Sequence, residues 1–223
     1  MDTQPLLQPE SNRGAWRWFL ASAAFAVLGV VAFMVDSHVA QWCIQDKLPG
    51  DLKKIFDFSE AFGHGVGITL ILITMFVLDP NHRRQFPRMI ACLLAVGLGA
   101  NLVKMMVARY RPKAFDNLFD WTQSIFVSFH KLFPLGDGGH SLQSFPSAHT
   151  TGAVALACCL SFIYPRGRWW FATLAALVAL QRINAGAHFV SDTCFGAALG
   201  ILISAFFLKT GPLARSFTRF EQK

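Results

Sequence analysis

Three short polar segments, each bordering a long apolar run, carry residues whose types and spacing could do chemistry. The first is KMMVARYRP, residues 104–112, in which Lys104 and Arg111 lie seven residues apart. Seven residues are two turns of an α-helix, so we expect both cations on one helix face, with Pro112 ending that helix. Such a face could bind an anion. The pattern is also typical of basic side chains that reach from a helix end to a membrane interface.

The second segment is FPSAHTTG, residues 145–152, which directly precedes the apolar run AVALACCLSFIY. Pro146 suits the first turn of a helix, and Ser147 can cap the helix or lie in that turn. The free backbone N–H groups at a helix start attract anions, phosphate above all. Ser147 adds a hydroxyl group and His149 an imidazole. The alternative is an ordinary helix cap beside a histidine without a role.

The third segment is QRINAGAHFVSD, residues 181–192. His188 and Asp192 lie four residues apart, hence on one face of a helix. A histidine that donates one ring N–H to a carboxylate has its other nitrogen free as a nucleophile or base. Arg182 lies just upstream, across a turn that contains glycine. The alternative is a buried His–Asp pair with a structural role.

Together the segments supply three cations, a hydroxyl, a helix N-terminus, two imidazoles and one carboxylate. A single carboxylate is too little for a metal cage, and the five cysteines show neither metal nor disulfide spacing. We therefore expect no metal and no other cofactor. The set suits a dianionic phosphate, because arginine forks match phosphate oxygens and lysine adds a point charge.

Long apolar blocks must position these segments. The chain is 53% hydrophobic and only 15% charged, which is too apolar for an ordinary soluble domain. A membrane-spanning helix needs about 20 apolar residues. Six blocks approach this length, at residues 16–35, 61–78, 89–107, 147–164, 169–180 (extending to 183) and 189–208. We predict an all-α, polytopic membrane protein with six transmembrane helices plus short interfacial helices, and no cleavable signal peptide.

The net charge of +7 could suggest nucleic acid, but the placement of the basic residues indicates membrane topology instead. The short connections DPNHRRQFPR, residues 79–88, and YPRGRWW, residues 164–170, are basic and therefore expected in the cytoplasm. Both termini then lie inside: a loose segment 1–14 before, and a tail 211–223 after, a membrane domain over 15–210. The three polar segments fall on the opposite side.

In order, the segments read K-x6-R-P, P-S-x-H and R-x5-H-x3-D, and this combination resembles the type 2 phosphatidic acid phosphatase family. That superfamily includes the vanadium haloperoxidases and glucose-6-phosphatase. The resemblance covers the chain from about the third apolar block onward. Two positions depart from the family pattern: Ala148 replaces a glycine and Gln181 replaces a serine. Both departures bear on substrate preference more than on chemistry.

The resemblance implies a role for each matching residue. His188, oriented by Asp192, would attack phosphorus and form a phosphohistidine. His149 would give a proton to the leaving oxygen. The phosphoryl oxygens would be held by Lys104, Arg111, Ser147, Arg182 and the backbone N–H groups that follow Ser147, including that of Ala148.

Two amphipathic segments could border a lateral entrance for a lipid tail. Apolar residues recur at helical spacing over 118–133, which favours a helix lying in the outer interface. DLKKIFDFSEAF, residues 51–62, is a second candidate of this kind. Glu60 and His64, on the same side of the membrane, are interpreted as structural polar groups, and the alternative is contact with a lipid head group.

The prediction is an integral membrane lipid phosphate phosphatase, metal-independent, in the bacterial inner membrane, with its site facing the periplasm or outside. One alternative is a phosphotransferase that passes the phosphoryl group from the histidine to a lipid or glycolipid. The other alternative is a non-enzymatic lipid carrier, but a carrier would leave the two histidines without a role. The partners expected are the bilayer and a phosphorylated lipid: phosphatidic acid, phosphatidylglycerol phosphate, polyprenyl pyrophosphate or a phosphorylated glycolipid.

Overall fold

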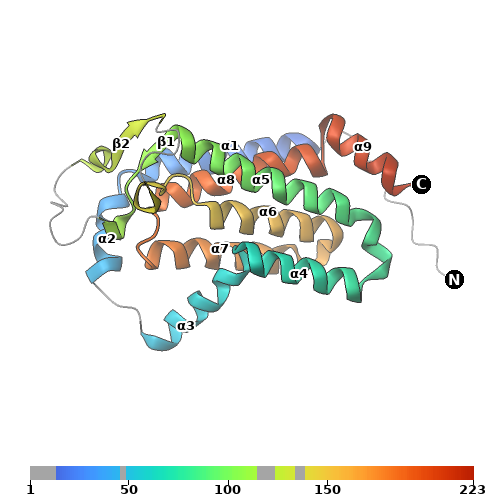
Figure 1. The fold of residues 1–223 in the computed structure, drawn as a ribbon, viewed down its shortest axis with the longest axis horizontal. Coiled ribbons are helices and arrows are strands. Elements are labelled where there is room, and N and C mark those ends of the chain that lie inside the picture. Colours follow the sequence, from blue (N-terminus) through green and yellow to red (C-terminus); the bar gives the residue numbers. More distant parts are fainter. Residues whose placement is uncertain (1–13, 46–48, 115–123, 134–138) are drawn as a thin grey trace.

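A computed structural model describes residues 14–45, 49–114, 124–133 and 139–223. The molecule is an elongated bundle in which the long helices run side by side (Figure 1). The helices are α1 (Ala15–Ala32), α2 (Asp36–Gln45), α3 (Gly50–Ser59), α4 (Gly65–Leu78), α5 (Phe86–Met106), α6 (Ala148–Ile163), α7 (Arg168–Asn184), α8 (Val190–Leu208) and α9 (Gly211–Glu221). Two short strands, β1 (Val107–Arg109) and β2 (Phe129–Leu132), form an antiparallel hairpin.

Each of the six apolar blocks forms one helix, namely α1, α4, α5, α6, α7 and α8, so the helical fold class is confirmed. By length and composition, three helical segments of the described chain could cross a membrane: Ala15–Ala32, Pro80–Met106 and Val190–Leu208. A fourth arises if Gly50–Phe62 and Gly65–Leu78, which meet at 67°, form one broken span. Helix α6 is apolar but shorter, with 16 residues. The helix positions thus agree with the prediction, while length alone does not give six spans.

The outer faces of these helices are strongly apolar. Val27 on α1, Val66 on α4 and Leu94 on α5 are 62%, 62% and 69% exposed, as are many of their neighbours. Exposed apolar surface of this extent is unfavourable in water and is typical of contact with lipid. The protein is an integral membrane protein.

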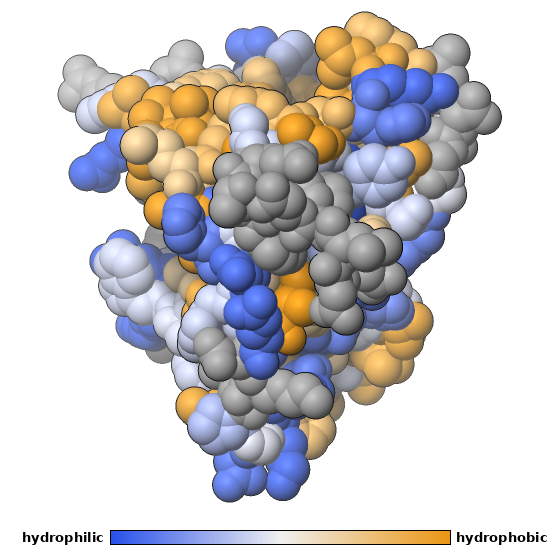
Figure 2. Space-filling model, turned by 90° about the vertical axis from the view of Figure 1, so that its left-hand side faces the viewer, coloured by the Kyte–Doolittle hydropathy of each residue, from blue (hydrophilic) through white to orange (hydrophobic). Residues whose placement is uncertain are grey.

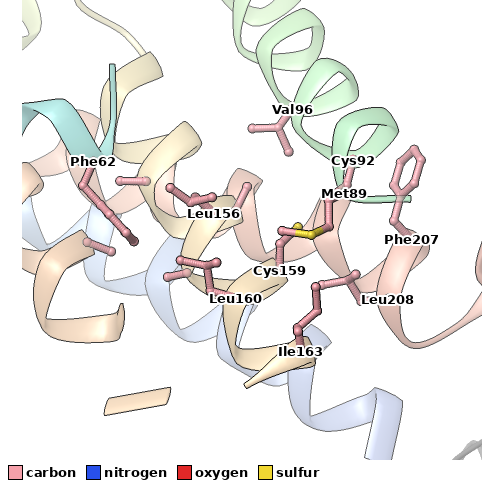
Figure 3. Close-up of a cluster of buried hydrophobic side chains, with 14 of the residues drawn as sticks. Phe62, Met89, Cys92, Val96, Leu156, Cys159, Leu160, Ile163, Phe207 and Leu208 are labelled. Carbon is pink, nitrogen blue, oxygen red and sulfur yellow. The ribbon is translucent and has the colours of Figure 1, made fainter. Parts of the chain in front are cut away.

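Helix α6 lies at the centre of the bundle and packs against α5, α7 and α8. The buried core combines Leu156, Cys159, Leu160 and Ile163 of α6 with side chains of the neighbouring helices (Figure 3). Helix α8 approaches α6 closely: a Cβ added at Gly196 would lie 2.8 Å from the Ser147 carbonyl oxygen. Only glycine allows this contact, which brings the starts of α6 and α8 together.

The prediction of an interfacial helix over 118–133 is wrong for the part that the structure describes; residues 115–123 lie outside it. Residues Ile125–Ser128 form a 3₁₀ turn, and Phe129–Leu132 form strand β2, which pairs with β1. The backbone of β2 makes its hydrogen bonds with β1. This tertiary pairing overrides the helical spacing of the apolar residues in the segment. The second candidate, residues 51–62, is helical, as α3 and the 3₁₀ turn Glu60–Phe62.

The first polar segment is not one helix either. Helix α5 ends at Met106, and the chain continues as β1 before the 3₁₀ turn Pro112–Ala114. Lys104 and Arg111 therefore do not share a helix face, and the prediction from their spacing is wrong on this point. Strand β1, residues Val107–Arg109, takes the place of the helix end that the pattern suggested.

The segment expected as a tail, residues 211–223, contains α9, which packs on α8. Arg88 of α5 is 2% exposed and forms an ion pair of 2.9 Å with Glu221. Its guanidinium group also donates a hydrogen bond of 2.8 Å to Thr218. The helix is therefore anchored to the bundle. Residues 1–13 lie outside the described part of the chain, so the expectation of a loose N-terminus is not tested there.

Candidate active site

The three polar segments converge at one end of the bundle, where β1, the start of α6 and the turn from α7 to α8 meet (Figure 1). Ser147 N–H of the second segment donates to the Asp192 carbonyl of the third (3.1 Å). Lys113 N–H, directly after the first segment, donates to the Gly186 carbonyl of the third (2.9 Å). Gly186 has a φ of 59°, a left-handed conformation that favours glycine. Seen from this end, a band of hydrophilic residues runs down the lower part of the face, whereas apolar residues cover much of its upper part (Figure 2).

Ser147 is the N-cap of α6. Its Oγ accepts hydrogen bonds from the backbone N–H (3.4 Å) and the hydroxyl (3.0 Å) of Thr150. The helix begins at Ala148, so Pro146 precedes the cap and does not lie in the first turn. The positive end of the helix dipole is thus directed at this end of the bundle, as anion binding would require.

His188 lies in the turn before α8, which begins at Val190, so the expected helix face shared with Asp192 does not exist. The ring is 3% exposed, and its Nδ1 lies 2.7 Å from the Ser144 carbonyl oxygen but 3.8 Å from Asp192 Oδ2. Nδ1–H therefore donates to Ser144, which leaves the lone pair of Nε2 free. Burial lowers the pKa of His188 to about 4, although Asp192 opposes this, so the ring is neutral at neutral pH.

Asp192 is fully buried and holds the parts around His188 in place. Its Oδ2 accepts hydrogen bonds from the Ser144 hydroxyl (2.6 Å) and the Phe189 N–H (2.9 Å). Its Oδ1 accepts a bond of 2.5 Å from Arg109. The carboxylate thus fixes Ser144, whose carbonyl in turn fixes the histidine ring.

Arg109 and Asp36 are functional candidates that sequence reasoning missed. Both side chains are 0% exposed, and Arg109 joins Asp36 (2.9 Å) to Asp192. Arg109 also donates to Ser128 (3.0 Å) and Ser191 (2.7 Å). Burial raises the pKa of Asp36, while Arg109 and Ser191 oppose the shift. A signal was present: Asp36 directly follows an apolar run, and a charge at that depth needs a partner.

The structure brings Lys104 and Arg111 together despite the missing helix face. Lys104 Nζ donates to the Gln143 carbonyl (2.6 Å), and the Arg111 guanidinium reaches the same oxygen at 3.5 Å. Arg111 Nε is buried and has no hydrogen-bond partner in the described residues. Burial lowers the pKa of Arg111, and the nearby Arg182 lowers it further. Such a cluster of cations favours a bound anion.

Glu60, interpreted from sequence as a structural group, lies at this site. Its carboxylate accepts hydrogen bonds from Arg182 and from Gln181 Nε2 (3.2 Å). His149 Nε2 lies 3.6 Å from the same carboxylate, and the His64 ring lies 5.5 Å from the His149 ring. Gln181, one of the two departures from the family pattern, thus contacts Glu60. Within the described ranges, no group of three or more His, Cys, Asp or Glu side chains could hold a metal ion.

The fold and the site are those of an integral membrane protein with a cationic cluster suited to a phosphate group. The PAP2 superfamily model matches residues 87–215, more than half of the 223 residues, and the chain belongs to this superfamily. The matched region contains all three polar segments. The predicted family is therefore confirmed.

Two curated relatives are informative. The chain is 34% identical to a lipid A 1-phosphatase of Rhizobium johnstonii over 122 residues, which are 52% of this chain and 46% of that protein. It is 28% identical to a decaprenylphosphoryl-5-phosphoribose phosphatase of Mycobacterium tuberculosis, over 79% of this chain and 88% of that protein. This chain spans about half the length of the lipid A phosphatase that it matches.

Among solved structures, LpxE of Aquifex aeolicus has a similar fold. The TM-score is 0.57 at 22% identity, and the match covers 79% of this chain and 96% of that one. At this identity the likeness concerns the fold alone.

Proposed function

We propose that the protein is a metal-independent phosphatase that removes a phosphate group from a membrane lipid through a phosphohistidine intermediate. The observation that carries the proposal is the environment of His188. The ring is buried and neutral, its Nδ1–H is bound to the Ser144 carbonyl, and the charges of Lys104 and Arg111 act on it. A neutral imidazole with a free Nε2 beside clustered cations is suited to attack a bound phosphate.

In the first step, the phosphate group lies at the N-terminus of α6, bound by the backbone N–H groups of Ala148 and the next residues and by the Ser147 hydroxyl. Lys104, Arg111 and Arg182 neutralise its oxygens as charge redistributes. His188 Nε2 forms a bond to phosphorus as the bond to the leaving oxygen breaks. His149 gives that oxygen a proton.

In the second step, a water molecule attacks the phosphohistidine. Its oxygen bonds to phosphorus as the N–P bond breaks, and one of its protons returns to His149. The sum is one lipid phosphate and one water converted to a lipid alcohol and inorganic phosphate. The three cations supply the charge stabilisation that a divalent ion supplies in other phosphatases.

The relatives guide the choice of substrate. Their names give lipid A and decaprenylphosphoryl-5-phosphoribose as the phosphorylated compounds. The proposed substrate here is a phosphate ester or anhydride on a glycolipid or on a polyprenyl-linked group. The test is phosphate release by the purified protein in detergent with EDTA present. The panel would comprise a phosphorylated glycolipid, polyprenyl pyrophosphate, phosphatidic acid and phosphatidylglycerol phosphate. Release that requires an added lipid or sugar acceptor would indicate a phosphotransferase instead, and no turnover at all would exclude both enzymes.

For topology we propose six spans, with both termini in the cytoplasm and the site on the outer side of the inner membrane. The basic connections 79–88 and 164–170 lie at the opposite end of the bundle from the site, which supports this orientation. Cys43 of α2 is partly exposed near the site end and provides a probe. In a variant whose other cysteines are replaced by alanine, an impermeant thiol reagent should label Cys43 in cells with only the outer barrier opened. Labelling only after lysis of the inner membrane would mean that Cys43 and the site face the cytoplasm.

A further inference from the structure

One carboxylate reaches the cationic cluster from outside the family motifs. Glu60 belongs to the 3₁₀ turn Glu60–Phe62, which joins α3 to α4 before the region that the family model matches. Its side chain is 34% exposed, and Arg182, with which it pairs, is 12% exposed. Gln181 donates to the second carboxylate oxygen at 3.2 Å. Two consecutive residues of α7 therefore hold this carboxylate in one place.

The same oxygen, Oε1, that pairs with Arg182 also faces His149, whose Nε2 lies 3.6 Å away. Nε2 is enclosed by protein and has no hydrogen-bond partner in the described part of the chain. The guanidinium groups of Arg182 and Arg111 also lie close enough to act on the ring electrostatically. A protonated imidazole in this position needs a nearby negative charge, and Glu60 supplies one.

We propose that Glu60 is the positioning residue of the proton donor. Its carboxylate accepts the Nε2–H of protonated His149 and fixes the ring so that the other nitrogen, Nδ1, presents its proton to the leaving oxygen. The enclosure of Nε2 supports this assignment of the two ring nitrogens, because the leaving group cannot reach a nitrogen that protein encloses. The inference rests on the proposed phosphatase activity and adds a role outside its motif residues.

The proton balance is complete. As the bond between phosphorus and the leaving oxygen breaks, His149 Nδ1–H transfers its proton to that oxygen, the lipid alcohol departs and the ring becomes neutral. The attacking water then returns one proton to Nδ1. Glu60 remains a carboxylate throughout and neither gains nor loses a proton.

The leaving group distinguishes this role from a structural one. A lipid alkoxide needs a proton as it departs, whereas a nitrophenolate departs without one. The measured quantity is kcat/KM, because it reports only the steps up to release of the leaving group and excludes the later attack of water, which uses His149 for both substrates. Glu60→Gln should therefore lower kcat/KM about 10–100-fold with an alkyl lipid phosphate. With an acylated nitrophenyl phosphate, kcat/KM should change by less than about threefold, since general-acid assistance is not needed for that leaving group.

Two further variants make the test independent of folding effects. His149→Ala should show the same dependence on the leaving group, and the double variant Glu60→Gln, His149→Ala should be no slower than His149→Ala alone, because both act at one step. Asp51→Asn, on the neighbouring helix α3 and 95% exposed, is the matched control and should leave both rates unchanged. If Glu60→Gln does not fold, Glu60→Asp replaces it and should show the same selectivity.

Equal slowing of both substrates by Glu60→Gln would overturn the inference, as would effects of Glu60→Gln and His149→Ala that multiply. In either case the phosphatase itself would stand, since the wild-type protein would still release phosphate from both substrates. If the wild-type protein released phosphate from neither substrate, the proposed function would fail, and the role of Glu60 with it.

Discussion

Replacing Arg109 with methionine should leave two buried carboxylates without a counter-charge. Asp36, Arg109 and Asp192 are each 0% exposed at the side chain, and the guanidinium group binds both carboxylates directly. With all three groups ionised, the cluster carries a net charge of −1. The Arg109→Met variant would carry −2 in the same volume, with Ser128 and Ser191 also losing a donor.

The expected loss follows from the burial. Breaking a buried ion pair by removing one partner costs about 3–5 kcal/mol, because the remaining charge stays desolvated. For a chain of this length, 1 kcal/mol shifts the melting temperature by about 2–4 °C. Arg109→Met should therefore lower the melting temperature by roughly 6–20 °C. The six tryptophans allow this to be followed by intrinsic fluorescence in detergent.

The Asp36→Asn substitution distinguishes the effect of the cluster's net charge from the effect of losing the Arg109 side chain. Alone, it gives the cluster a net charge of zero and removes a single charge-assisted bond to Arg109, so its effect should be smaller than that of Arg109→Met. Combined with Arg109→Met, it removes one of the two uncompensated carboxylates, and the double variant should melt above Arg109→Met alone. Arg84→Met, at an exposed position far from the site, is the control.

Two results would contradict the role of Arg109 as counter-charge to two ionised carboxylates. In the first, Arg109→Met melts within about 2 °C of the wild-type protein, a shift worth no more than about 1 kcal/mol. In the second, the double variant melts below Arg109→Met alone. The first result would mean that the buried carboxylates are not ionised. The second would mean that Asp36 stabilises the fold without Arg109.

Three further predictions concern the chemistry. His188→Ala should abolish turnover with the fold retained, measured by phosphate release and by thermal unfolding; a phosphoprotein still trapped in this variant would assign the nucleophile elsewhere. The acidic limb of kcat/KM should lie near pH 4, because His188 attacks only when neutral and burial lowers its pKa to about 4; a limb near 6.5 would mean that the ring is solvated during attack. Activity should survive EDTA and be inhibited by vanadate, which mimics five-coordinate phosphorus, whereas a strict magnesium requirement of the purified protein would contradict a site built on Lys104, Arg111 and Arg182.

The helices could be predicted from the sequence because a helix that contacts lipid requires a continuous apolar run within one segment of the chain. Each apolar block is a continuous run, and each became one helix, with ends displaced by a few residues. The two amphipathic segments show the limit of this approach. Residues 51–62 are helical, whereas Phe129–Leu132, within residues 118–133, pair as β2 with β1. Side-chain spacing does not reveal a strand partner that lies 20 to 25 residues away.

The site residues outside the motifs could not be found in the same way, because their partners are distant in sequence. Arg109 binds Asp36 across 73 residues and Asp192 across 83, and Arg182 binds Glu60 across 122 residues. Arg109 and Glu60 look ordinary in their own segments, and only the position of Asp36 directly after an apolar run gives a local signal. What identifies them is burial against an opposite charge, a property of the tertiary structure alone.

The i,i+4 spacing of His188 and Asp192 shows why a motif can be informative for a reason other than the one that it suggests. The two residues are not neighbours on a helix face, since α8 begins between them. Their link passes through Ser144: the carboxylate accepts the serine hydroxyl at 2.6 Å, and the serine carbonyl accepts Nδ1–H of the histidine at 2.7 Å. Arg109 holds the far side of the same carboxylate. The orientation of the proposed nucleophile therefore depends on a buried network that begins at Asp36, in a helix that precedes all three motifs.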